Sequence, residues 1–323
     1  MSNQDFVIGI DIGGTNTKVG LVDRKAKIHV HFDLPTQSEK PASDLFKRIF
    51  YKLDEYYKQF SVNANILGIG IGAPNGNYFT GSIENPPNLK WSSVNLVELA
   101  KEHLNVPVAV TNDANAAALG EMLFGVAREM KNFIEVTLGT GLGSGIIVNG
   151  ELVYGHDGFA GEMGHVIVEK NGRLCGCGRR GCLETYVSAN GLRRTVFEML
   201  ANDNGLDEQS SLQNIPFNDL TSKMVYDAAL EGDPIALKSF EYTGRILGEA
   251  LADAVAYFSP EAIILFGGLA AAGDFIFIPT KKHMEKNLLS IYKNKVKILP
   301  SGLPESDAAI LGSAALIWNE LER

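Results

Sequence analysis

The chain has 323 residues, of which 45% are hydrophobic and 21% charged, and its formal net charge is −9. This length predicts two domains or one large one, and the composition is that of a globular protein with sizeable cores. The negative charge argues against a nucleic-acid partner and against binding to an anionic membrane, because both need a basic face. The sequence carries neither a basic, apolar leader nor a run of about 18 apolar residues. We therefore expect no signal peptide, no membrane span and a cytosolic location.

Predicted strands and helices alternate along the first part of the chain. Two strands joined by a glycine-rich turn occupy 6–23 and a third covers 27–35, which predicts an antiparallel meander. The elements expected next are a helix at 42–60, a strand at 66–74, a helix at 93–104, a strand at 106–113 and a helix at 114–125. Such alternation is typical of an α/β fold.

A second strand–turn–strand unit at 133–155 resembles the first. At a fixed offset, residues 11–14 (DIGG) align with 137–140 (TLGT), and 20–23 (GLVD) align with 146–149 (IIVN). This predicts either two halves of similar design with a ligand between them or two unrelated glycine-rich hairpins. The elements expected after this unit are helices at 186–202, 221–231 and 234–258, strands at 262–268 and 295–302, and a closing helix at 306–323.

All cysteines of the chain lie between positions 175 and 182, in a loop rich in glycine. Three thiolates and one imidazole suit tetrahedral zinc, and glycine lets a short loop fold around an ion. The four candidate ligands are His165, Cys175, Cys177 and Cys182. A complete ligand set predicts a structural ion rather than a catalytic one. Three free thiols, or an iron or copper ion, are the alternatives.

Three glycine-rich turns are candidates for holding a nucleotide. Backbone N–H groups in such turns can point at phosphate oxygens, Asp11 could hold Mg²⁺, and Lys18 could add a positive charge. The candidate residues of the turns are Gly13, Gly14 and Thr15, then Thr140 and Gly141, and finally Gly267 and Gly268 as a nucleoside platform. Each turn alone could be purely structural. The chain has no P-loop motif, and Pro74 follows GIGIGA (68–73) where a dinucleotide fold needs a helix.

Asn112 and Asp113 stand where a strand is expected to end and a helix to begin. They could simply cap the helix, or Asp113 could accept the proton of an attacking hydroxyl while Asn112 binds a neighbouring one. Glu162 and Glu184 lie close to the metal candidates in the sequence, and a polyol ligand needs such carboxylates. Each could equally be a surface or helix-start residue. A zinc-bound His165 could turn its other ring nitrogen toward the sugar.

Taken together, DIGGTNTK, TNDANAAALGE, LGTGLGSG, GEMGH and the cysteine run GH…CxCGxxGCxE resemble the ROK family (repressor, open reading frame, kinase) over nearly the whole chain. The resemblance implies an actin/hexokinase-like fold, a duplicated ribonuclease H-type α/β architecture with two domains and a cleft between them. We expect a smaller domain of 1–112 plus 306–323 and a larger domain of 113–305 that carries the zinc site. One departure is Asn75, inserted between Pro74 and Gly76, which puts the exact sugar preference in doubt.

The resemblance also implies roles for residues at matching positions. Asp113 looks like the general base acting on the sugar 6-hydroxyl, and the four metal candidates look like a zinc set. The residues that look like sugar ligands are Asn112, Glu162, His165 and Glu184, with Gly76 and Asn88 as further lining. Repressors of the family carry an N-terminal helix-turn-helix region, for which we expect no room before the turn at Asp11.

The resemblance implies a sugar kinase, and we expect a glucokinase that converts glucose and ATP to glucose 6-phosphate and ADP, with Mg²⁺ accompanying the ATP. A kinase for fructose, mannose or an N-acetylated hexosamine is the alternative among enzymes. A sugar-sensing protein without catalysis is the alternative from another class. The resemblance also suggests a homodimer or homotetramer.

Overall fold

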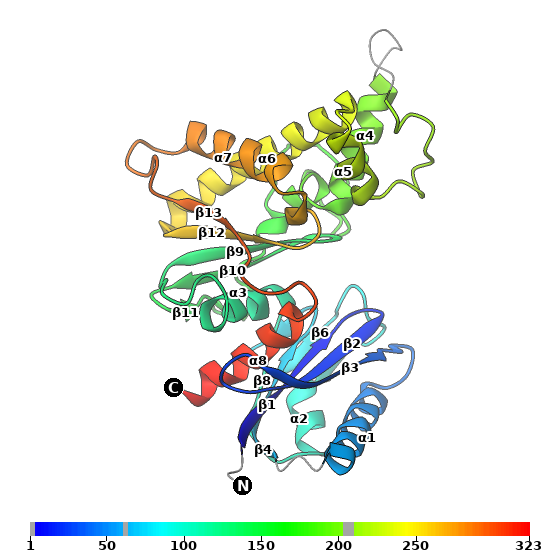
Figure 1. The fold of residues 1–323 in the computed structure, drawn as a ribbon, viewed down its shortest axis with the longest axis vertical. Helices are drawn as coiled ribbons and strands as arrows, with labels where there is room; N and C mark the ends of the chain where they lie inside the picture. Colours follow the sequence, from blue (N-terminus) through cyan, green and yellow to red (C-terminus); the bar gives the residue numbers. More distant parts are fainter. Residues whose placement is uncertain (1–3, 61–63, 203–209) are drawn as a thin grey trace. The chain divides into compact units, whose positions relative to one another are not determined.

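A computed structural model describes residues 4–60, 64–202 and 210–323 of the chain (Figure 1). The chain divides into two compact units. The first contains 1–131, 145–161 and 301–323, and the second contains 132–144 and 162–300. In the part of the chain that the structure describes, no helix is both long and apolar enough to cross a membrane.

The first unit is built on a five-stranded sheet with the order β3-β2-β1-β4-β8. Its strands are β1 (Gln4–Ile12), β2 (Asn16–Val22), β3 (Ile28–Pro35), β4 (Ala64–Gly72) and β8 (Val108–Thr111). The first three pair as an antiparallel meander, as predicted, whereas β4 pairs in parallel with β1 and β8. The helices of this unit are α1 (Ala42–Phe60), α2 (Leu96–Lys101), α3 (Asp113–Leu123) and α8 (Ala308–Leu321).

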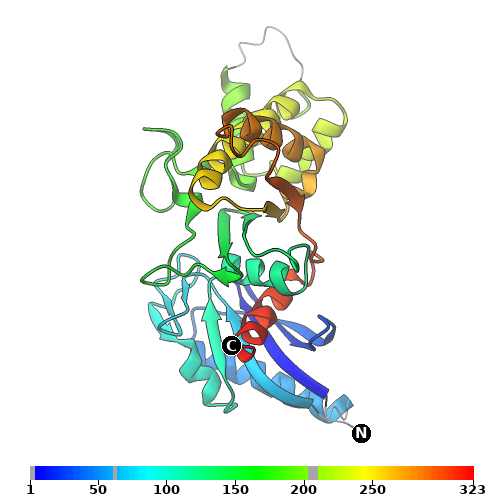
Figure 2. The same cartoon turned by 90° about the vertical axis from the view of Figure 1, so that its left-hand side faces the viewer.

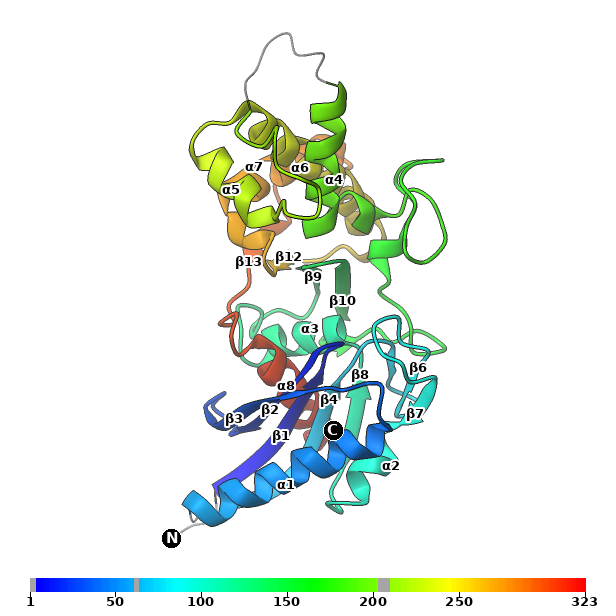
Figure 3. The same cartoon turned by 90° about the vertical axis from the view of Figure 1, so that its right-hand side faces the viewer.

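Alternation of isoleucine and glycine in β1 and β4 explains how helices cover both faces of this sheet. Ile8 and Ile10 are fully buried in the same apolar cluster as Phe46 of α1. Helix α1 lies beside β1 in Figure 3. Gly9 of β1 and Gly68 and Gly70 of β4 face α8, which lies along β1 (Figure 2). A Cβ atom at Gly9 would lie 2.5 Å from the carbonyl oxygen of Ile310, so only glycine admits the helix backbone this closely. The glycines of GIGIGA are thus packing residues rather than a dinucleotide motif.

The second unit carries most of a sheet with the order β11-β10-β9-β12-β13. The strands are β9 (Phe133–Leu138), β10 (Leu142–Val148), β11 (Glu151–Leu152), β12 (Ala262–Phe266) and β13 (Lys297–Pro300). The division between the units runs through β10. The helices are α4 (Ala189–Asn202), α5 (Ser222–Leu230), α6 (Pro234–Phe258) and α7 (Asp274–Asn287), with short 3₁₀ turns η1 (Met163–His165), η2 (Leu183–Thr185) and η3 (Ala270–Ala272).

The two large sheets repeat one design. In each, the first three strands in chain order stand as third-second-first, followed by the fourth and the fifth. In each, the first strand pairs in parallel with the fourth, and the fourth with the fifth. The predicted α/β fold is therefore confirmed, and the similarity of 11–14 to 137–140 reflects a repeated architecture rather than two unrelated hairpins.

The unit boundary differs from the predicted domain boundary. Helix α3 belongs to the first unit, because it packs against α8, and so does the segment 145–161. At this contact a Cβ atom at Gly312 of α8 would lie 2.7 Å from the carbonyl oxygen of Ala116. The predicted larger domain began at residue 113, ahead of this helix.

Several element predictions need correction. The helix expected at 93–104 is limited to α2, because Asn95 caps it through a hydrogen bond from Glu98 N (3.0 Å). Residues Ser93–Asn95 instead form β7, which joins β5 (Gly76–Asn77) and β6 (Ser82–Glu84) in a small antiparallel sheet that sequence reasoning missed. Helix α7 was also missed, since Pro279 lies inside it.

Candidate active site and metal centre

At the β8–α3 junction the structure shows the capping role that was considered for Asn112. Asn112 is the N-cap of α3, and its side-chain oxygen accepts a hydrogen bond from Asn115 N (2.7 Å). Asp113 is the first residue of the helix, with an exposed side chain whose Oδ1 accepts from Ala114 N (3.0 Å). The cap leaves the Asn112 amide nitrogen available as a hydrogen-bond donor to a ligand. A helix N-terminus stabilises the ionised form of the adjacent carboxylate.

Asp11 lies near Asp113 within the first unit. It sits at the end of β1, opposite Lys18 of β2 and Gly72 of β4. Burial and the charge of Asp113 raise the pKa of Asp11 to about 7, and Lys18 opposes the shift. Desolvation by the surrounding protein also raises the pKa of Asp113, although its side chain keeps solvent access. A carboxylate whose ionisation is disfavoured by burial and by a neighbouring carboxylate is a suitable environment for a divalent cation.

The first glycine-rich turn joins β1 to β2. Gly13 N donates to Asn16 O (3.0 Å), so this N–H closes the turn and is not free for a phosphate. Gly14 and Thr15 are exposed and stay candidates. A Cβ atom at Gly14 would lie 2.9 Å from the carbonyl oxygen of Asn88. Asn88, predicted as sugar lining, therefore stands against the phosphate turn.

Gly76 packs against the strand that leads to Asn112. A Cβ atom there would collide with the carbonyl oxygen of Thr111, which explains the requirement for glycine. The inserted Asn75 adopts a left-handed backbone conformation with φ of 53°. Its side-chain nitrogen donates to Glu84 O (2.9 Å). The insertion is thus absorbed by a local turn tied to β6.

In the second unit, the turn between β9 and β10 is fixed by the start of α4. Ala189 N donates to Gly139 O (2.9 Å), and Asn190 Nδ2 donates to Thr140 O (3.1 Å). A Cβ atom at Gly141 would lie 2.8 Å from Glu184 Oε2, so a candidate sugar ligand stands beside this turn.

The Gly267–Gly268 turn lies beside the end of β9. Gly267 has φ of 97°, and a Cβ atom there would lie 2.8 Å from Leu138 O. Leu269 N donates to the same carbonyl oxygen (3.1 Å). A Cβ atom at Gly268 would meet nothing within 4 Å, so the backbone at this residue is open to a ligand. The two glycine-rich turns predicted in this unit are therefore neighbours.

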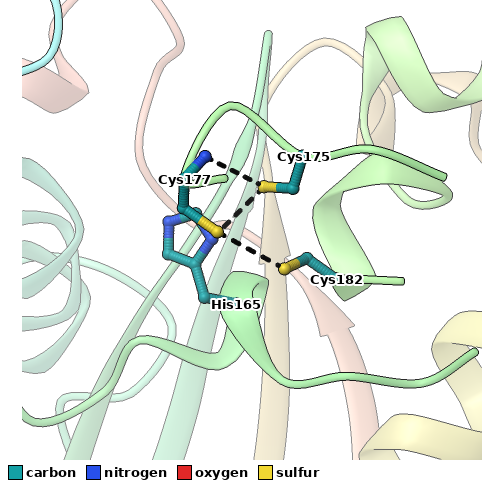
Figure 4. Close-up of side chains that lie close together, drawn as sticks. All are labelled: His165, Cys175, Cys177 and Cys182. Atoms are coloured by element: carbon teal, nitrogen blue, oxygen red, sulfur yellow. Dashed lines mark hydrogen bonds between the residues drawn. The ribbon is translucent and has the colours of Figure 1, made fainter. Parts of the chain in front are cut away.

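The metal candidates converge in the second unit. One ligand atom each from His165, Cys175, Cys177 and Cys182 lies within 4.8 Å of all the others (Figure 4). Cys177 Sγ and Cys182 Sγ are 3.6 Å apart, close to the ~3.8 Å that ~2.3 Å zinc–sulfur bonds give in a tetrahedron. The three cysteines form no disulfide. Hydrogen bonding from Arg179 lowers the pKa of Cys177 to about 6, which favours its thiolate, whereas burial raises the pKa of Cys175 and of Cys182.

His165 and Glu184 join the metal candidates to the candidate sugar ligands. The imidazole turns Nδ1 toward the cluster, 3.7 Å from Cys175 Sγ. Its Nε2 is therefore the nitrogen left for a ligand. Glu184 Oε1 accepts from Cys175 Sγ (2.9 Å) and lies 3.8 Å from His165 Nδ1. Glu162 is exposed and occupies the N-cap position of the 3₁₀ turn that carries His165, where its side chain makes no capping hydrogen bond.

Arg173 is a site residue that sequence reasoning missed. It lies two residues before Cys175, with a side chain only 6% exposed. Its guanidinium makes two hydrogen bonds to Glu198 of α4 (2.9 and 2.5 Å) and one to Thr185 O (2.8 Å), and it lies over the ring of Tyr186. The arginine thus ties the segment that carries the metal candidates (165–182, called the metal loop below) to α4 and to the turn that carries Glu184. No spacing or motif distinguishes it from the exposed arginines at 179 and 180.

Comparison with known proteins gives similarity over nearly the whole chain. A model of the ROK family matches residues 7–320. A glucokinase of Halalkalibacterium halodurans is 34% identical over 315 residues, which are 97% of this chain and 94% of that protein. The crystal structure of a ROK family glucokinase from Streptomyces griseus, in complex with glucose and AMPPNP, has a TM-score of 0.78 at 32% identity, covering 96% of this chain and 98% of that one. A xylose repressor of Bacillus spizizenii is 29% identical over 319 residues, which are 78% of that protein.

Proposed function

Because the chain belongs to the ROK family, we propose that it is an ATP-dependent hexose kinase whose substrate is glucose and whose products are glucose 6-phosphate and ADP. The family resemblance inferred from the motifs is confirmed. The same similarity supports the actin/hexokinase-like fold and a sugar phosphotransferase activity.

The observation that carries this proposal is the carboxylate of Asp113 at the head of α3, beside Asp11. A general base must be ionised at working pH and yet basic enough to take a hydroxyl proton. The helix start favours ionisation of Asp113, while desolvation raises its pKa. We therefore assign Asp113 as the base for the 6-hydroxyl, with Asn112 donating to a neighbouring sugar oxygen through its amide nitrogen.

The remaining sugar contacts are assigned to Glu162, Glu184 and the Nε2 atom of His165, with Gly76 as lining. The arrangement of His165 and the three cysteines fits a zinc ion, which would supply a structural brace and no reacting group. His165, held through Nδ1, would keep one tautomer and present Nε2 to a sugar hydroxyl. Glu184, adjacent to both His165 and Cys175, would be oriented by the same loop.

The ATP phosphates are assigned to the exposed N–H groups of the first turn and to the β9–β10 turn. The residues are Gly14, Thr15 and Lys18 in the first unit and Thr140, Gly141, Gly267 and Gly268 in the second. Gly13 would serve by closing its turn. Asp11 would hold Mg²⁺, directly or through water, and this ion would offset charge on the β- and γ-phosphates.

The test is an ADP-release assay with glucose, mannose, fructose and N-acetylated hexosamines. Glucose is expected to give the highest kcat/KM. Faster turnover of another hexose would move the assignment to that kinase. The xylose repressor among the relatives supports a sugar-sensing protein without catalysis as the second candidate function. A sugar-dependent rise in melting temperature without ADP release would favour that alternative.

Assembly and compartment are further parts of the proposal. The family resemblance supports a homodimer or homotetramer, and light scattering on the purified chain would measure its mass. The composition supports a cytosolic location and no nucleic-acid partner, and imaging of a fluorescently tagged chain would test the location.

A further inference from the structure

The segment from Val153 to Gly161 leads from β11 to the candidate sugar ligands Glu162 and His165. It follows β11 and belongs to the first unit as far as Gly161. Glu162, the next residue, is the first of its stretch in the second unit and belongs with His165 to the GEMGH motif (161–165). A contact that holds this segment in place therefore also fixes where the chain leaves the first unit, directly before the sugar-ligand candidates Glu162 and His165.

Asn77 makes such a contact. Its side chain is buried, with 2% exposure for the residue. Its Nδ2 donates to Asp157 O (2.7 Å), and its Oδ1 accepts from Phe79 N (3.0 Å) and Thr80 N (3.3 Å). The oxygen thus shapes the turn after Gly76, while the nitrogen straps that turn to the connecting segment. A buried amide with all of these groups paired holds one orientation.

The surroundings of Asn77 are built to the same end. Gly158 has φ of 89°, and a Cβ atom there would lie 2.7 Å from Asn77 Oδ1, so the segment approaches the amide as closely as glycine allows. Tyr154 stacks on Tyr78 with ring centroids 4.1 Å apart. The Tyr154 hydroxyl also hydrogen-bonds the side chain of Thr111, directly before Asn112.

We propose that Asn77 is a positioning residue for hexose binding, which joins the Gly76 turn, the end of β8 and the segment leading to Glu162 into one rigid piece. It touches no reacting atom, and it acts through the residues assigned to the sugar. This inference rests on the proposed function. It predicts that the contribution of Asn77 falls on the hexose and not on ATP, because none of its partners lies in a phosphate turn.

The test removes the donor nitrogen of the Asn77 amide and keeps an acceptor oxygen in its place. Asn77→Asp and Asn77→Ser both keep an oxygen to accept from the turn, and both remove the Nδ2 group that donates to Asp157 O; the serine hydroxyl can donate, but its side chain is shorter. The hexose KM is expected to rise by about tenfold, the factor that one buried hydrogen bond represents, with the ATP KM within about twofold. Asn65→Ser is the control, because it removes the side-chain nitrogen of another asparagine, an exposed one that donates to the carboxylate oxygen Oδ1 of Asp5 (2.8 Å), far from this segment in sequence.

A second readout keeps the inference separate from the kinase assignment. Hydrogen exchange of the 155–161 amides should accelerate in both Asn77 variants and stay unchanged in the control. Hexose affinity measured by calorimetry without ATP should fall by the same factor as the KM rises. Unchanged exchange and hexose affinity would overturn the role of Asn77, and so would equal rises in both KM values. A wild-type chain that binds hexose without turning it over would refute the kinase proposal alone. The role of Asn77 would still be tested, because hydrogen exchange and hexose affinity do not depend on turnover.

Discussion

Replacing Asp113 with asparagine tests the assignment of the general base. The variant preserves shape, and its Oδ1 can still accept from Ala114 N, so helix α3 keeps its first turn. The side chain is exposed and ionised carboxylates add only modestly to helix stability, so we expect a melting temperature within a few degrees of wild type. What the variant loses is the ability to take a proton.

The expected loss follows from that single change. General-base assistance accelerates a reaction by roughly 10²–10⁴-fold, which corresponds to about 3–5 kcal/mol of barrier. The kcat of Asp113→Asn should fall by at least a hundredfold, with the hexose dissociation constant within about threefold, because the amide can still contact the hydroxyl. Steady-state kinetics and calorimetry measure the two quantities.

A matched control removes a carboxylate from an equivalent backbone position. Asp274 is likewise the first residue of its helix, α7, and it is assigned no part in the reaction. Asp274→Asn should leave kcat within about twofold, as expected for a surface change. If Asp113→Asn retained more than about a tenth of wild-type kcat, the base assignment would be wrong.

Three further predictions concern the metal loop and the pH profile. Cys177→Ser should reduce zinc below half an equivalent per chain by elemental analysis, lower the melting temperature and raise the hexose KM, since His165 loses its brace; full zinc retention would contradict the ligand assignment. Arg173→Met should destabilise the fold by about 3 kcal/mol in denaturant titration, because partners of a buried charge are left unpaired, whereas a change under 1 kcal/mol would show that the network contributes little. The base must be unprotonated and the pKa of Asp113 is raised, so kcat should fall as pH is lowered, with a midpoint above the ordinary carboxyl value of about 4; a kcat constant down to pH 4 would contradict this.

Regular patterns made much of the fold predictable. The alternation in β1 and β4 identified strands, and the turn chemistry of 11–18 and 138–145 located both hairpins. Helix α7 escaped because Pro279 interrupts the helical pattern, yet its ring packs against Gly244 of α6, where a Cβ atom would lie 2.6 Å away. The small β5-β6-β7 sheet escaped because its strands have only two or three residues.

The candidate site also contains residues that local sequence patterns mark and residues that they do not. Cysteine spacing and the strand-to-helix junction at Asp113 are local signals, and they led to the proposed metal ligands and the proposed base. Asn77 and Arg173 act through partners that are distant in sequence, Asp157 and Glu198. Their importance follows only from burial and hydrogen bonding in the folded chain. A single asparagine or arginine in a polar loop carries no such information.

Phosphorus NMR of the purified chain with glucose, ATP and Mg²⁺ tests the central claim most directly. The account predicts that the γ-phosphate signal of ATP is replaced by that of a phosphate ester on the 6-oxygen of glucose, with one ADP formed per ester, and that Asp113→Asn slows this at least a hundredfold. Glucose binding detected by calorimetry, with the ATP signals unchanged, would contradict the claim and favour a sugar-sensing protein.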